Sequence, residues 1–206
     1  MRVAVELPSD LASPGEFLAD VQAYEAAGAD AVWLAPGSLE PLTLTAAAAA
    51  VTSRIGLVAW LPAPDAWPAE PLAAVVATLR RLSLDRVAFG VAGADAIAAL
   101  RAAAAGRPVL LAGDGEHAAE RADGLVRDLE GAGAAFERAR ALRPPPEFEL
   151  WARLPAPAGR AAWREALAAA EELAATGVAV PHAPNLLDIL RNPEEDDRQD
   201  LAMATG

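Results

Sequence analysis

Residues 80–93, RRLSLDRVAFGVAG, contain the step that decides the fold. The two arginines end an alanine- and leucine-rich helical pattern, Ser83 and Asp85 interrupt it, and a short apolar run then ends at glycines. A helix, a turn and a short strand form one helix-to-strand unit of an α/β fold. Gly90 and Gly93 leave two interpretations open: they bind a phosphate, or they let the chain turn and pack closely. We favour the second, structural interpretation.

The same unit recurs along the chain. Eight short apolar runs, bounded by Gly, Pro or Asp, alternate with amphipathic helical patterns. The runs cover residues 2–8, 31–36, 55–62, 86–93, 108–113, 123–129, 148–155 and 177–181, and the helical patterns cover 14–27, 41–53, 68–83, 94–105, 132–142 and 159–175. Short, continuously apolar strands that alternate with helices are typical of a parallel sheet covered on both faces.

Eight such units predict an α/β protein, a compact (β/α)8 TIM barrel with reduced loops. An incomplete barrel or an open parallel α/β sheet is the alternative, because only residues 114–122 connect the fifth run to the sixth. We expect residues 1–191 to form a single barrel domain and residues 192–206 to form an acidic C-terminal tail.

The composition argues against several classes of function. The chain has 206 residues, a net charge of −12, no cysteine, and 17 basic residues that are all arginine. An acidic surface repels nucleic acids and anionic membranes, so we expect neither as a partner. The absence of lysine rules out Schiff-base chemistry, and the absence of cysteine suits a cytoplasmic location. A composition rich in alanine and arginine is typical of a GC-rich bacterial genome.

Three segments carry a further pattern: 25–61 (EAAGADAVWLAPGSLEPLTLTAAAAAVTSRIGLVAWL), 78–93 (TLRRLSLDRVAFGVAG) and 107–126 (RPVLLAGDGEHAAERADGLV). In combination they resemble the luciferase-like monooxygenases, the superfamily of bacterial luciferase and the flavin- or F420-dependent oxidoreductases. The matching residues are Glu25, Gly28, Asp30, Trp33, Pro41, Leu42, Thr52, Arg54, Ile55, Thr78, Leu79, Leu82, Ser83, Arg86, Gly90, Gly93, Pro108, Ala122, Asp123 and Gly124.

The resemblance implies a homodimeric TIM barrel that binds FMN or F420 at the carboxyl ends of its strands. It also implies oxidoreduction or monooxygenation of a small-molecule substrate. The chain departs from the family where F420-using relatives commonly carry an Asp-His pair, since it has Ala35 and Pro36 there. It also places Asp114 and Glu116 in the loop where relatives hold the cofactor phosphate, and carboxylates repel a phosphate.

These departures keep an alternative open, a non-catalytic flavin-binding or cofactor-free barrel that acts as a carrier or interaction protein. Whether the chain is an enzyme therefore stays open at this point. Candidate cofactor-binding residues at the expected strand ends are Trp60, Gly90, Gly93, Gly113, Gly115, Arg127 and Arg153. Trp60 would serve as a stacking platform for the cofactor ring, although packing in the core is the interpretation we favour.

Glu6 and His182 are the candidate catalytic residues, because they lie near the ends of the first and eighth runs. In a barrel mouth they could act as acid and base, even in a cofactor-free lyase or isomerase. For Glu6 we favour an ion pair with Arg127 or Arg153. Two histidines, His117 and His182, without a third ligand predict no metal site.

Overall fold

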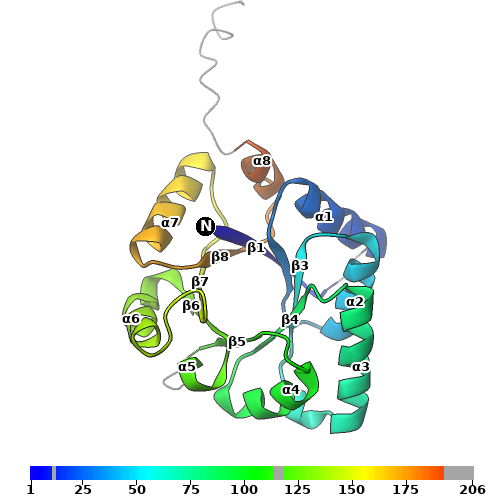
Figure 1. Ribbon diagram of the computed structural model, residues 1–206. Coiled ribbons are helices and arrows are strands. Elements are labelled where there is room, and N and C mark those ends of the chain that lie inside the picture. The colour runs from blue at the N-terminus through cyan, green and yellow to red at the C-terminus, as the bar shows by residue number, and fades with distance from the viewer. Residues whose placement is uncertain (11–12, 114–117, 193–206) are drawn as a thin grey trace, which may run out of the picture.

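The computed structural model describes residues 1–10, 13–113 and 118–192, and eight parallel strands in this part form a closed barrel (Figure 1). Each strand pairs with the next in sequence, and the last pairs with the first. The strands are β1 (Arg2–Leu7), β2 (Ala31–Leu34), β3 (Gly56–Trp60), β4 (Val87–Val91), β5 (Val109–Ala112), β6 (Gly124–Asp128), β7 (Glu149–Arg153) and β8 (Gly177–Pro181). The predicted TIM barrel is confirmed, and the open-sheet alternative is wrong.

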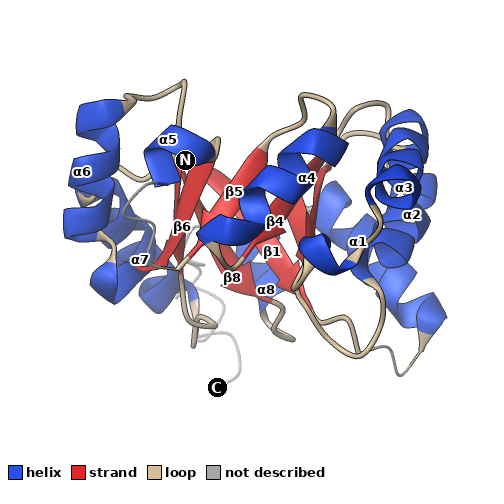
Figure 2. Cartoon of the chain, turned by 90° about the horizontal axis from the view of Figure 1, so that it is seen from below, coloured by secondary structure: helices blue, strands red, loops and turns tan. Residues whose placement is uncertain are grey.

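Helices surround the barrel in Figures 1 and 2. They are α1 (Pro14–Ala26), α2 (Pro41–Val51), α3 (Ala69–Leu82), α4 (Ile97–Ala104), α5 (Ala118–Arg121), α6 (Gly133–Leu142), α7 (Arg160–Glu172) and α8 (Leu186–Arg191), with short 3-10 turns at Pro64–Ala66, Ala94–Ala96 and Leu129–Gly131. Helix α5 has only 4 residues. The strands β5 and β6 nevertheless pair in parallel across this short connection. No helix of the described residues is long and apolar enough to cross a membrane. Residues 193–206 of the predicted tail lie outside the described part.

Two residues of the family pattern, Glu25 and Arg86, stabilise the amino end of the barrel through hydrogen bonds. The Glu25 carboxylate accepts hydrogen bonds from the backbone N–H groups of Ser53, Arg54 and Ile55 at 2.8, 2.6 and 3.0 Å. The Arg86 guanidinium donates to the carbonyl oxygens of Ile55 and Thr52 at 2.6 and 3.0 Å. Both side chains thus hold the turn between α2 and β3. These two matched residues therefore stabilise the fold at this turn.

Three tryptophans, which we call the tryptophan column, lie together in the barrel interior. The Trp33 ring on β2 lies 5.5 Å from the ring of Trp60 on β3 and 5.1 Å from the ring of Trp151 on β7. All three residues are at most 4% exposed. TIM barrels usually fill this space with layers of branched aliphatic side chains. Here three large rings share the interior with alanines and with the aliphatic side chains of Val58, Leu110 and Val126.

Two glycines make room for the column. A Cβ placed on Gly90 would lie 2.4 Å from the Trp60 ring, and one on Gly177 would lie 2.4 Å from the Trp151 ring. The strand registers pair Trp60 with Gly90 and Trp151 with Gly177, so each ring lies over the neighbouring strand's backbone. Both glycines are therefore required by close packing rather than by an unusual backbone angle.

We predict that Gly90→Ala lowers the free energy of unfolding by about 1–3 kcal/mol, because the added methyl group overpacks the interior against Trp60. The matched control is Gly15→Ala, since a Cβ on Gly15 of α1 meets nothing within 4 Å. We expect this control to be neutral or slightly stabilising. Urea unfolding of both variants measures the difference, and equal stabilities would contradict the packing argument.

Glu25 makes the free energy of unfolding depend on pH, and the direction of its pKa shift sets the sign. Burial alone would raise the pKa of Glu25, but the hydrogen bonds from Ile55, Arg54 and Ser53 outweigh it and lower this pKa below its usual value of 4.5. A carboxyl group whose pKa is lower in the folded state stabilises the fold above its unfolded pKa and loses that effect as pH falls through the folded one.

We therefore predict that Glu25→Gln costs about 1–2 kcal/mol of unfolding free energy at pH 7. The difference from wild type should shrink as the pH falls below 4.5. Denaturant unfolding between pH 7 and pH 3 checks this, with the exposed Glu137→Gln as control. A difference that does not change over this range would contradict the role given to the charge.

Candidate functional site

Glu6 and Arg153 form an ion pair at the carboxyl end of the barrel. The Arg153 Nε donates to Glu6 Oε1 at 2.7 Å, and the Glu6 side chain is 15% exposed. The two residues lie on either side of β8, because Glu6 pairs with Pro181 and Arg153 with Ala179. Of the two arginines expected beside Glu6, Arg153 is thus the partner. The Arg153 guanidinium also lies 6.0 Å from the centre of the Trp60 ring.

A cavity of about 500 Å³ opens beside this pair. We call it the carboxyl-end cavity, and its lining residues are Gly113, Val126, Arg127, Asp128, Glu130, Gly131 and Arg153. The Arg153 Nη1 lies 3.9 Å from Asp128 Oδ1, but the Asp128 side chain is 81% exposed, so water screens this contact. The cavity therefore carries two arginines and two carboxylates, with the guanidinium of Arg153 at the border of the interior.

Trp60 lies beneath this surface as a core residue. It is 4% exposed and packs against Gly90. Its indole Nε1 is buried and has no hydrogen-bond partner. The stacking face proposed from the sequence is thus covered on one side by the β4 backbone and approached by Arg153 on the other.

The candidate phosphate-binding glycines differ in their surroundings. Gly113 has φ +98°, a left-handed conformation that favours glycine, and Gly93 has open space around the position of a Cβ. Gly93 precedes the 3-10 turn before α4, and no side chain caps α4. Gly115, together with Asp114 and Glu116, lies outside the described residues, as does His117.

His182 is turned toward α1. Its Nδ1 lies 2.8 Å from the hydroxyl of Tyr24, and its backbone N–H donates to the Glu6 carbonyl oxygen at 2.8 Å. Burial, helped by the charge of Asp20, raises the pKa of Tyr24 well above its usual range, so the hydroxyl keeps its proton beside the His182 ring. The ring of His182 is therefore held by a buried partner on α1. The sequence offered no sign of Tyr24 as this partner, because it lies 158 positions away.

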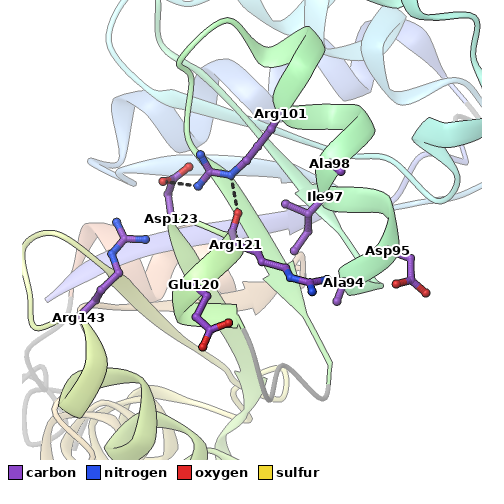
Figure 3. Close-up of a pocket in the computed structure, with 9 residues that line it drawn as sticks. All are labelled: Ala94, Asp95, Ile97, Ala98, Arg101, Glu120, Arg121, Asp123 and Arg143. Carbon is purple, nitrogen blue, oxygen red and sulfur yellow. Dashed lines mark hydrogen bonds and ion pairs between the residues drawn. The ribbon is translucent and has the colours of Figure 1, made fainter.

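A second hollow lies on the outside of the barrel, between α4 and the short α5, with a volume of about 670 Å³ (Figure 3). Arg101 bridges its wall, since it donates to Asp123 at 2.8 Å and to the Arg121 carbonyl oxygen. Figure 3 shows the Arg121 side chain extending toward Ala94 and Ile97 of the opposite wall. Three arginines and three carboxylates line it, so their charges balance. Among the described residues, no three potential metal ligands come together here or elsewhere.

Comparison with known structures shows the same barrel in redox enzymes. The coenzyme F420-dependent tetrahydromethanopterin reductase of Methanopyrus kandleri superposes with a TM-score of 0.76 at 11% identity, over 92% of this chain and 96% of that one. An F420-dependent secondary alcohol dehydrogenase gives 0.71 at 12%, over 92% and 97%. The FMN-bound oxygenating component of 3,6-diketocamphane monooxygenase from Pseudomonas putida gives 0.59 at 13%, over 84% and 72%.

At these identities the superpositions show the fold alone. No curated protein matches the chain in sequence. Residues 1–101, however, match the sequence model of the luciferase-like monooxygenases. This segment contains residues 25–61 and 78–93, two of the three stretches that carry the resemblance. The first 101 residues of the chain are thus similar in sequence to the luciferase-like monooxygenases, the family that the sequence pattern resembles.

Proposed function

We propose that the chain is an oxidoreductase or monooxygenase that uses FMN or F420 and acts on a small molecule at the carboxyl end of its barrel. The observation that carries this proposal is the family match of residues 1–101. Similar structures whose names include F420 or FMN support a cofactor of the flavin type. Ligands of α/β barrels bind at the carboxyl ends of the strands, where the carboxyl-end cavity lies.

The residues present fit the anionic part of such a cofactor. Arg127 and Arg153 line the same cavity, and a guanidinium group offers paired N–H donors to phosphate oxygens. Gly113 adds a left-handed turn at the end of β5, where no side chain restricts the approach of a ligand. Asp128 and Glu130 oppose an anion, so we expect the affinity to depend strongly on the two arginines.

The bound cofactor would supply the hydride or oxygen chemistry. The chain's own residues would bind and orient the cofactor and exclude water from it. Glu6 holds the Arg153 guanidinium through Oε1, which fixes its direction over Trp60. The tryptophan column closes the interior beneath the cavity and keeps water from that side. Glu6 Oε2, the carboxylate oxygen that does not accept from Arg153 Nε, is the atom through which we propose that a proton of the substrate is accepted.

Titration of the purified protein with FMN and with F420, followed by fluorescence, tests this function. We expect one of the two to bind and Arg153→Gln to weaken it roughly tenfold or more, because a charge-assisted contact is lost. The matched control is Arg81→Gln, which removes the same charge at an exposed position at the end of α3. Failure of both cofactors to bind, or equal affinities in the two variants, would contradict the proposal.

The titration, followed by a turnover assay on the loaded protein, separates an enzyme from a carrier or interaction protein. An enzyme turns over when a reductant and a substrate are added to the loaded protein. A carrier or interaction protein would bind the cofactor without turnover, and a cofactor-free barrel would bind neither.

A further inference from the structure

A second interior cavity lies at the opposite end of the barrel. It has a volume of about 150 Å³, and residues at the beginnings of the strands line it, among them Arg2 of β1, Gly56 of β3 and Glu149 of β7. Trp33 and Trp151 of the tryptophan column form part of its wall. We call it the amino-end cavity. One water needs only roughly 10–15 Å³, so there is room for a molecule of several heavy atoms.

Two residues of this wall carry hydrogen-bond donors without a partner. Trp33 is fully buried, and its indole Nε1 makes no hydrogen bond. The Nε of Arg86 is also buried and unpaired. Buried polar groups in proteins nearly always have a partner, so two orphaned donors on one cavity indicate an acceptor that fills it.

The acceptors on the same wall are already engaged. Glu149 Oε1 accepts from Arg2 at 2.9 Å, and Glu149 Oε2 accepts from the Trp151 indole at 2.7 Å. Asp30 Oδ2 accepts from the backbone N–H of Val3 at 2.7 Å. The buried side-chain groups of this wall that still lack a hydrogen-bond partner are therefore donors.

The charges on the wall also favour an acceptor with negative charge, because Asp30, the carboxylate of this wall that forms no ion pair with the described residues, is exposed to water. Arg2 is neutralised by Glu149, but Arg86 is held only by neutral oxygens, those of Ile55, Thr52 and Ala49. Among the described residues, no carboxylate forms an ion pair with Arg86. Burial lowers the pKa of Arg86, partly opposed by Glu25, as expected for a half-buried cation without a counter-charge in contact.

We propose that the amino-end cavity binds a small monocarboxylate, whose oxygens accept hydrogen bonds from Trp33 Nε1 and Arg86 Nε. The size of the cavity limits the ligand to a few heavy atoms, such as formate or acetate. The site is separate from the proposed cofactor site, because the tryptophan column lies between the two ends of the barrel. It does not depend on the proposed oxidoreductase activity.

The indole N–H signals in a two-dimensional NMR spectrum test the proposal on the wild-type protein. Five tryptophans give separate signals, and Trp33→Phe assigns the one of interest. We expect acetate to shift the Trp33 signal in a saturable way, while acetamide and sodium chloride at equal concentration do not. Trp60 is an internal control, since its Nε1 is also unpaired but does not line this cavity.

The absence of a saturable shift, an equal response to acetamide, or an equal shift of Trp60 would overturn the proposal. Asp30→Asn provides a second arm with the opposite sign. Asp30 lines the cavity and repels an anion, while an asparagine oxygen can still accept the Val3 hydrogen bond. We expect acetate to bind several-fold more tightly to this variant, and unchanged or weaker binding would overturn the electrostatic argument.

Discussion

The packing of Trp33 between Trp60 and Trp151 is the constraint on which the rest of the structure depends. Closing eight strands into a ring leaves an interior that side chains must fill to native density. Three indole rings lie in that interior, and Gly90 and Gly177 are directly under two of them. Exchange of large for small residues at any of these positions changes the packing of the whole interior.

An arginine–glutamate pair lies at each end of the column. Arg2 pairs with Glu149 at the amino end and lies 4.7 Å from the centre of the Trp151 ring. Arg153 pairs with Glu6 at the carboxyl end and lies over Trp60. Both pairs join β1 to β7 across the shorter side chains of β8. The charges thus sit where the interior meets water, and the two cavities next to them differ in the chemistry they offer.

Much of the fold could be predicted from the sequence, because continuous apolar runs and capping residues are local signals. The helical pattern expected over 14–27 became α1, with Ser13 as its N-cap, and the strand that ends the opening segment became β4. The faces of the strands could not be predicted, since a run that is apolar at every position does not show which residues point inward. The tryptophan column was missed for this reason, although all three tryptophans lie in predicted strands.

The site was less predictable than the fold. The partner of Glu6 depends on which strand lies two places away from β1. Because the barrel closes, β8 pairs with both β1 and β7, and this brings Arg153 of β7 next to Glu6. His182 follows Pro181, which pairs with the inward-facing Glu6, so its ring turns outward to Tyr24. One residue of register reverses the direction of a side chain, and the sequence does not contain that information.

Three tryptophan rings contact one another inside the closed barrel. Nuclear Overhauser contacts between the ring protons of Trp33 and those of both Trp60 and Trp151 measure this directly in solution. The structure predicts both sets of contacts, with ring centres 5.5 and 5.1 Å apart. Ring contacts from Trp33 to Tyr24 and the outer core, without contacts to the other two tryptophans, would contradict it.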